Sequence, residues 1–232
     1  MLGKDTSRSI GDRPLTAMFG ILFAIFVFSV FYLLFGKTGL VILAFAFWAP
    51  LIPLRWVGWR FVAPDLQHPD RIPSPATTLL GYGGGFSTTI VLSILGRQLL
   101  TSWQLNLPGL STWLGILLLG ITFLIWYAMA RKIGWKYRTV AMPELESKSN
   151  SPVTDGIYAY TRHPEYLSEP ICIIGLLLIT GAASLLFLLG LWALFVYPVI
   201  SLEERRLVER YGVQYQRYAQ TTSKLLPFRH RK

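Results

Sequence analysis

The chain has 232 residues, of which 53% are hydrophobic and only 15% are charged, and its mean hydropathy is +0.46. The apolar residues fall in long blocks rather than in amphipathic stripes, which excludes an ordinary soluble domain. The formal net charge is +10, but the basic residues flank the apolar blocks and no nucleic-acid motif accompanies them. We therefore expect an integral membrane protein whose partners are membrane lipids with anionic headgroups, and no nucleic acid.

The first apolar block runs from Leu15 to Phe35 without a charge, which is long enough to cross a hydrocarbon core of about 30 Å. Lys4, Arg8 and Arg13 precede it as in a signal peptide, but no small-residue cleavage site follows, so we expect a retained helix. The other predicted spans are residues 39–54, 76–100, 110–130, 164–181 and 183–202. The last two are expected to form a helical hairpin.

The distribution of lysine and arginine tests this layout of about six spans independently of hydropathy. With the N-terminus in the cytoplasm, the inner segments hold 20 of the 22 basic residues, and the outer segments hold Lys37 and Arg97. Basic residues are enriched in the cytoplasmic loops of membrane proteins. We therefore predict a multi-pass protein with both termini in the cytoplasm.

The predicted fold class is all-α, a polytopic transmembrane helical bundle. Residues 1–130 are predicted to be a transmembrane scaffold of four spans. Residues 131–232 hold a polar cytoplasmic loop, the hairpin and a cytoplasmic C-terminal extension. The polar motifs are concentrated in this second region, so we expect the functional residues there.

The C-terminal extension shows apolar and aromatic residues at helical spacing, among them Leu207, Tyr211, Tyr215 and Tyr218. Residues 201–219 are therefore predicted to be one helix that continues the last span. Tyrosine is common at membrane interfaces, and Tyr160, Tyr215 and Tyr218 are interpreted as residues of that kind.

The run GIYAYTRHPEY at residues 156–166 places ionisable side chains directly before the hairpin. Such residues at the edge of a membrane segment are usually functional. Proline suits the first turn of a helix, so a helix is expected to start at Pro164. The N–H groups of that turn would form an anion site, with His163 as a further donor. The structural alternative is a helix cap whose Arg162 reaches toward lipid headgroups.

Glu203 and Glu204 end the last predicted span. Successive helical residues are about 100° apart around the axis, so only one of the two can face inward. Glu203 lies one turn after Val199 and one turn before Leu207, on the apolar stripe, a phase that is consistent with an inward-facing side chain. The structural alternative is a solvated helix end.

These motifs, together with the tyrosines after residue 210 and the Leu226-Pro227-Phe228 run, extend over residues 153–228. The arrangement resembles the isoprenylcysteine carboxyl methyltransferase and phospholipid methyltransferase superfamily of integral membrane enzymes. The resemblance implies an S-adenosyl-L-methionine-dependent methyltransferase. It also implies a lipophilic methyl acceptor, either an isoprenylcysteine-like carboxylate or a lipid amine.

The resemblance assigns roles residue by residue. The catalytic residues that it implies are Glu203, Arg162 and Glu169. The residues that it implies for cofactor binding are Val153, Gly156, Tyr158, His163, Pro164, Tyr166, Glu203 and Glu204. The three histidines of the chain show no metal-ligand spacing, so no metal site is expected.

The chain departs from the family pattern near the expected acceptor. Val199 stands where the prenylcysteine enzymes carry an arginine, and Ser168 stands where a small glycine is usual. Glu169 is an acid that phospholipid-type members often carry. The acceptor therefore stays open between the two classes. An NADPH-dependent sterol-type membrane reductase, and a non-catalytic membrane transporter or scaffold, are the alternative functions.

Overall fold

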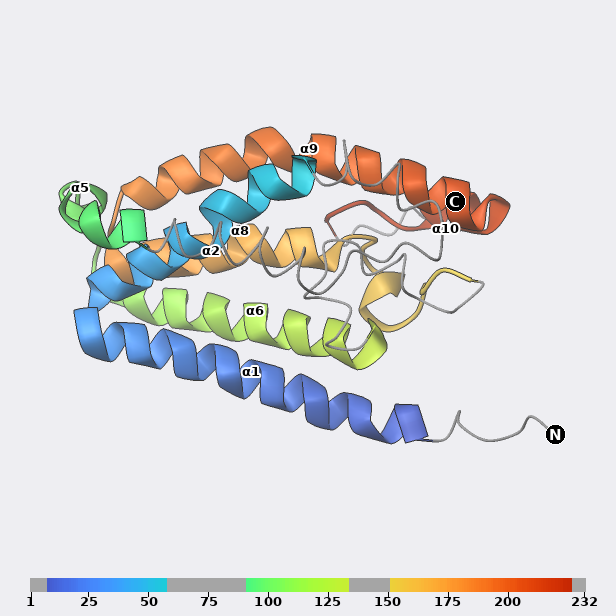
Figure 1. Ribbon diagram of the computed structural model, residues 1–232, viewed down its shortest axis with the longest axis horizontal. Coiled ribbons are helices and arrows are strands. Elements are labelled where there is room, and N and C mark those ends of the chain that lie inside the picture. The colour runs from blue at the N-terminus through green and yellow to red at the C-terminus, as the bar shows by residue number, and fades with distance from the viewer. Residues whose placement is uncertain (1–7, 58–90, 134–150, 227–232) are drawn as a thin grey trace. The chain divides into compact units, whose positions relative to one another are not determined.

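Helices make up the regular structure of the chain wherever the computed structural model describes it, at residues 8–57, 91–133 and 151–226 (Figure 1). Within these ranges the extended pairings are two isolated bridges, Gln104 with Ala182 and Thr161 with Ser223. The all-α prediction is therefore confirmed for the described residues. The helices are, in chain order, α1 (Arg8–Phe35), α2 (Lys37–Val57), α5 (Arg97–Thr101), α6 (Leu110–Ile133), the 3-10 helix η5 (Gly156–Ala159), α8 (Pro164–Thr180), α9 (Ser184–Tyr211) and α10 (Val213–Thr221).

The chain divides into two structural units, each built from segments that are distant in sequence. Unit 1 comprises Met1–Val27, Phe123–Ser168 and Leu207–Lys232, whereas unit 2 comprises Phe28–Thr122 and Glu169–Arg206. The functional division of the chain at residue 130 stays a prediction.

The predicted helix at residues 201–219 is wrong in one respect, because it is interrupted. Helix α9 ends at Tyr211 and α10 begins at Val213, and Gly212 between them has φ +55°. Glycine adopts this left-handed conformation without the steric cost that a side chain imposes. The hydrophobic periodicity of the sequence continues across residue 212, so it could not reveal this break. Because of the break, the direction of α10 is not fixed by that of α9.

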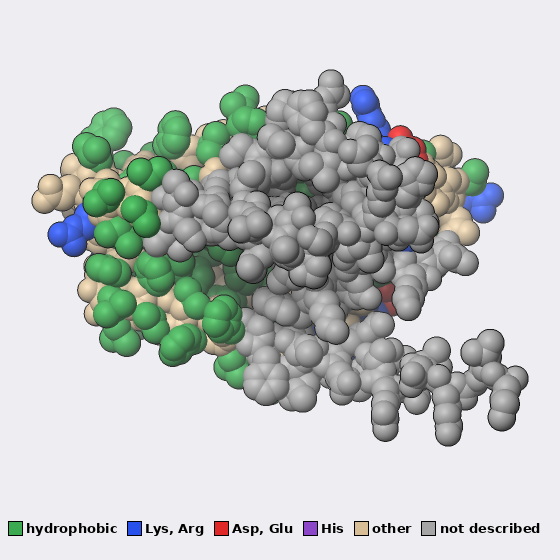
Figure 2. Space-filling model, in the orientation of Figure 1, with side chains coloured by type: hydrophobic (Ala, Val, Ile, Leu, Met, Phe, Trp, Pro, Cys, Tyr) green, Lys and Arg blue, Asp and Glu red, His purple; other side chains and the backbone are tan. Residues whose placement is uncertain are grey.

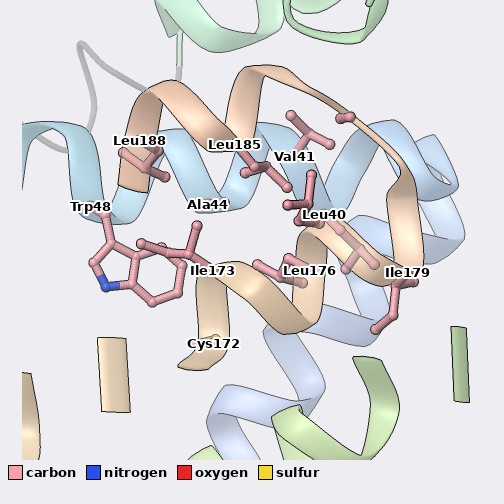
Figure 3. Packing of buried hydrophobic residues seen from close by; sticks show 12 residues of the cluster. Leu40, Val41, Ala44, Trp48, Cys172, Ile173, Leu176, Ile179, Leu185 and Leu188 are labelled. Atoms are coloured by element: carbon pink, nitrogen blue, oxygen red, sulfur yellow. The ribbon is translucent and has the colours of Figure 1, made fainter. Parts of the chain in front are cut away.

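The core of unit 2 is formed by α2, α8 and α9 (Figure 3). Leu40, Ala44 and Trp48 are spaced four residues apart and therefore lie along one face of α2. That face packs against Ile173 and Leu176 of α8, and also against residues near the start of α9. Cys172 is buried in the same cluster.

A close approach of backbones, rather than large side chains, joins α6 to α8. A Cβ placed at Gly115 would lie 2.6 Å from the carbonyl oxygen of Gly175 and 2.7 Å from Cγ1 of Ile179. Small residues allow such approaches between apolar helices, where van der Waals packing is a main source of association. By contrast, Gly120 on the same helix faces open space.

The surface of unit 2 is apolar in the way that a lipid-facing protein requires. In Figure 2 hydrophobic side chains gather on the left of the visible face. Leu33 and Leu99 each expose 81% of their surface. Such large apolar exposure is unusual in a soluble monomer, and supports a membrane protein.

Within the described parts of the chain, two helical segments are long and apolar enough to cross a bilayer, Leu110–Lys132 and Ser184–Tyr211, while Ile21–Phe35 and Lys37–Ala49 are shorter apolar helices. Most of the span predicted at residues 76–100 lies outside the described residues. The six-span arrangement, the hairpin crossing and the cytoplasmic termini stay predictions.

Gly115→Ala and Gly120→Ala are predicted to change stability in opposite directions. Alanine is favoured over glycine in a helix by about 0.5–1 kcal/mol, so the change at residue 120 should stabilise the protein. At residue 115 the added methyl overlaps the backbone of α8, and overpacking of this kind costs about 1–3 kcal/mol. Melting temperatures of the detergent-purified variants test this, and a Gly115→Ala protein as stable as the Gly120→Ala protein would contradict the close approach.

Candidate functional site

The motif segment, residues 156–166, has the local structure that its glycine and proline require. Gly156 opens η5 with φ +63°, a conformation that side chains rarely adopt. Pro164 is the first residue of α8, so the helix start predicted from proline is observed. The residues between them turn the chain from η5 into α8 and lie within unit 1.

The end of α6 holds the beginning of the motif segment. The Nζ of Lys132 forms an ion pair with Oδ2 of Asp155. The same lysine stem lies over Gly156, because a Cβ added to that glycine would be 2.7 Å from Cε of Lys132. Gly156 is therefore needed for its backbone angle, whereas an added Cβ would require the flexible lysine side chain to move.

The rings predicted to bind a cofactor lie close together at the start of α8. His163 is only 3% exposed and Tyr166 is 7% exposed, and their ring centroids are 5.7 Å apart. Tyr158 and Pro164 are also buried, whereas Val153 is half-buried. Among the residues predicted for cofactor binding, the structure thus brings His163 and Tyr166 into contact.

The backbone ahead of α8 is occupied by the chain's C-terminal segment. The N–H of Arg162 donates to the carbonyl oxygen of Ser223 at 2.9 Å, and the N–H of His163 donates to that of Lys224 at 3.1 Å. An anion at this helix start would therefore have to be bound by N–H groups that follow Pro164. The anion site that the sequence predicts is therefore restricted to the N–H groups of α8 that follow Pro164.

Arg162 reaches the C-terminal end of α10. Its Nη1 donates to the carbonyl oxygen of Ala219 and, at 2.8 Å, to that of Thr222. The last carbonyl groups of a helix lack partners within the helix, and a cation near them is favoured by the helix dipole. The guanidinium therefore caps a helix end in this structure, as in the structural alternative, although the partner is α10 and not a headgroup.

Ser168 has a specific role where a glycine is usual in the family. The Nε1 of Trp126 donates to Oγ of Ser168 at 2.8 Å, and that hydroxyl donates to the carbonyl oxygen of Glu165 at 2.7 Å. The serine thus connects α6 to the first turn of α8.

The predicted carboxylates Glu169, Glu203 and Glu204 lie in unit 2. Glu169 is buried in α8, and Oε2 accepts a hydrogen bond from Nε1 of Trp192 on α9 at 3.1 Å. Trp192 packs against the hydrophobic core cluster, so this carboxylate lies beside apolar side chains. A buried carboxylate is costly unless it is hydrogen-bonded, which makes the tryptophan contact significant.

The burial of the acidic pair follows the helical phase expected from the sequence. Glu203 is 6% exposed, and Val199 and Leu207, one turn before and after it, are also buried. Glu204 is half-buried. The catalytic and binding roles of these glutamates stay predictions. Among the described residues, no three His, Cys, Asp or Glu side chains are grouped as metal ligands.

Sequence reasoning missed the contribution of α10. Tyr218 is buried, and its hydroxyl donates to the carbonyl oxygen of Tyr158 at 2.6 Å. Tyr215 is buried beside it, with the two rings in an edge-to-face arrangement. The interpretation of these tyrosines as membrane-interface residues is wrong. Their spacing indicated only an amphipathic helix, and no local signal pairs Tyr218 with a residue 60 positions earlier.

Comparisons with known proteins agree with the motifs. A family model described as Phospholipid methyltransferase matches residues 110–214. Over 83 residues the chain is 39% identical to Protein-S-isoprenylcysteine O-methyltransferase of Schizosaccharomyces pombe, which covers 35% of this chain and 35% of that relative. Over 198 residues it is 26% identical to the protein of the same name from Dictyostelium discoideum, which covers 74% of this chain and 73% of that relative.

These matches confirm the resemblance to the isoprenylcysteine carboxyl methyltransferase and phospholipid methyltransferase superfamily, and they support a membrane methyltransferase. The match to the Schizosaccharomyces pombe protein spans about a third, 35%, of that protein's length. The family match begins at the first residue of α6 and ends in α10, so it includes every residue predicted for the site.

Gly156→Ala is predicted to destabilise the protein more than Gly109→Ala. A side chain in the left-handed region costs about 1–2 kcal/mol, and the added methyl also displaces the stem of Lys132. Gly109 has no atom within 4 Å of an added Cβ and is not among the glycines with positive φ. Thermal unfolding of both variants measures the difference. Equal melting temperatures would show that the backbone angle at residue 156 is not required.

Proposed function

We propose that this protein transfers a methyl group from S-adenosyl-L-methionine to a lipophilic acceptor at a membrane. The observation that carries the proposal is the contact of two buried rings, His163 and Tyr166, at the start of α8 within the region matched by the methyltransferase family. When bound, S-adenosyl-L-methionine would supply an activated methyl group. In such a transfer a lone pair of the acceptor would form the new bond to the methyl carbon, while the carbon–sulfur bond would break and leave its electron pair on sulfur.

The residues around the start of α8 fit such a donor. A ring face of Tyr166 suits a sulfonium or an adenine, and the helix N-terminus together with His163 suits a carboxylate. We propose Tyr158, Gly156, Val153 and Pro164 as residues that shape the same donor site. The burial of His163 and Tyr166 favours this role, because polar interactions are stronger where water is excluded.

The glutamates are proposed to bind or deprotonate the positively charged groups of the donor and the acceptor. Glu203 is assigned to the donor's ammonium group and Glu204 to a supporting position beside it. Glu169 is the candidate base for an amine acceptor, because an ammonium must lose its proton before it can accept a methyl group. For Arg162, the bonds to α10 favour a role through positioning over direct contact with the reacting groups.

The acceptor is proposed to be lipophilic, and two classes are supported by different observations. The names of both relatives favour the carboxylate of an isoprenylcysteine. The buried valine at residue 199, with no cation to receive a carboxylate there, and the hydrogen-bonded Glu169 favour a lipid amine. We further propose that the protein spans the membrane about six times with both termini in the cytoplasm, so that the donor reaches it from the cytoplasm.

The proposal is tested by titrating the detergent-purified protein with S-adenosylhomocysteine and, separately, with NADPH. We expect binding of S-adenosylhomocysteine, and His163→Ala should weaken it about tenfold to a hundredfold through loss of a hydrogen bond to a charged group. Calorimetry gives both affinity and stoichiometry, so misfolding is separated from weakened binding. Binding of NADPH alone would instead support a reductase, and binding of neither ligand would support a non-catalytic protein.

The acceptor class is distinguished by the chemistry of the product. Purified protein and methyl-labelled donor are incubated with a farnesylated cysteine derivative or with phosphatidylethanolamine vesicles. A methyl ester releases its label as methanol in alkali, whereas an N-methyl group keeps it. Volatile label would identify a carboxylate acceptor, and alkali-stable label in lipid would identify an amine acceptor.

Glu203→Gln is predicted to reduce donor binding or turnover more than Glu204→Gln. Water has little access to the buried Glu203 and could not readily replace an interaction lost there, whereas it can reach the half-buried Glu204. The expected loss for Glu203→Gln is about tenfold or more. The matched pair differs only in helical phase, and methyl incorporation measures both. A severe loss in Glu204→Gln with full activity in Glu203→Gln would reverse the assignment.

A further inference from the structure

Helix α10 and the residues after it are bound to the part of the motif segment that leads into α8. Tyr218 of α10 donates to the carbonyl oxygen of Tyr158, at the front of this stretch. At its other end, the N–H groups of Arg162 and His163 donate to the carbonyl oxygens of Ser223 and Lys224. We call residues 222–224 the strap. The hydroxyl of Thr161 also donates to the strap, at 3.0 Å from the carbonyl oxygen of Lys224.

The side chain of Arg162 adds further hydrogen bonds between the motif segment and the C-terminal segment. The guanidinium bonds to Ala219 in the last turn of α10 and to Thr222 in the strap, so one nitrogen spans the junction between the helix and the strap. Arg162 therefore binds the C-terminal segment twice, through its backbone N–H and through Nη1. A guanidinium used in this way fixes the direction in which the strap leaves α10.

Tyr218 anchors α10 through its own side chain. It packs with Tyr215 and with Leu207 of α9 in a small hydrophobic cluster of unit 1. The ring is therefore held by α9, while the hydroxyl holds the backbone of Tyr158. Through this side chain the position of α10 is coupled to the position of η5.

We propose that Arg162 and Tyr218 are positioning residues that hold α10 and the strap against residues 158–163 and thereby set the backbone carrying His163 and Tyr166. This inference rests on the proposed function, in which those two rings bind the methyl donor. Neither Arg162 nor Tyr218 needs to touch the donor for this role. They act by fixing where the first turn of α8 presents its donor-binding groups.

The length of α10 makes these bonds important for its order. It has nine residues, and isolated helices shorter than about 12–15 residues are marginal in water. Its position must therefore come from tertiary contacts, which are the tyrosine cluster and the bonds to the motif segment. Loss of one of these bonds should loosen α10 and the strap locally while leaving the remaining helices folded.

The test compares Tyr218→Phe and Arg162→Gln with matched controls. Tyr160→Phe removes a hydroxyl from a tyrosine that is 64% exposed, and Arg217→Gln removes a guanidinium from an exposed position on α10 itself. Each full-length variant is purified in detergent. S-adenosylhomocysteine binding is measured by calorimetry, and amide hydrogen exchange is measured over residues 213–224.

We expect the dissociation constant to rise about three- to tenfold in Tyr218→Phe and about tenfold or more in Arg162→Gln, with unchanged stoichiometry. Exchange over residues 213–224 should become faster in both variants, and the two controls should match the wild type. A merely structural role would lower the fraction of protein that binds and leave the affinity of the rest unchanged. Because both residues act through α10, the double variant should lose less than the product of the two single effects.

Three results would overturn the inference. Wild-type affinity in both single variants would show that the position of α10 does not matter for the donor. Weaker binding in Arg162→Gln with unchanged exchange over residues 213–224 would show that Arg162 contacts the donor directly. Absence of S-adenosylhomocysteine binding in the wild type would overturn the proposed function as well, whereas the first two results leave that function standing.

Discussion

The structure of unit 1 depends on one constraint: the buried backbone N–H groups just before α8 need hydrogen-bond acceptors. Residues 161–163 approach the helix through buried surroundings, and a buried N–H group that finds no hydrogen bond costs about 1–3 kcal/mol. The chain meets this constraint with carbonyl groups from its C-terminal segment rather than with a local cap. The proposed donor site and the C-terminal segment therefore cannot be ordered independently of each other.

The interruption of the last helices follows from the same constraint. A helix that continued through residue 212 would fix the direction of residues 213–224 by that of α9. The left-handed Gly212 ends α9, and the nine residues of α10 then lead to Ser223 and Lys224, whose carbonyl groups meet the motif segment. One residue without a side chain thus gives the chain the freedom that the long-range contacts require.

The features that sequence predicted are those with a local physical cause. Proline fixed the start of α8, and the spacing of Val199, Glu203 and Leu207 placed the three on one buried helical face. The hydrogen bond between Arg162 and Ala219 could not be predicted from the sequence, because periodicity carries no information on contacts between residues 57 positions apart. The tyrosines of α10 were misinterpreted for a related reason. An amphipathic pattern shows that a face is covered but does not show what covers it.

The carboxylates of unit 2 pose a different electrostatic problem. Glu169 sits beside apolar side chains, and its bond from Trp192 supplies a neutral donor rather than a charge. A neutral donor lessens the cost of burying a carboxylate. In the proposed function, a carboxylate at residue 169 would favour a cationic or amine acceptor over a carboxylate acceptor. In the family that the chain resembles, an arginine is expected at the position of the buried Val199, and its absence would shift the proposed acceptor preference in the same direction. On this proposal the choice of acceptor would depend on a few side chains of unit 2, whereas donor binding would depend on the start of α8.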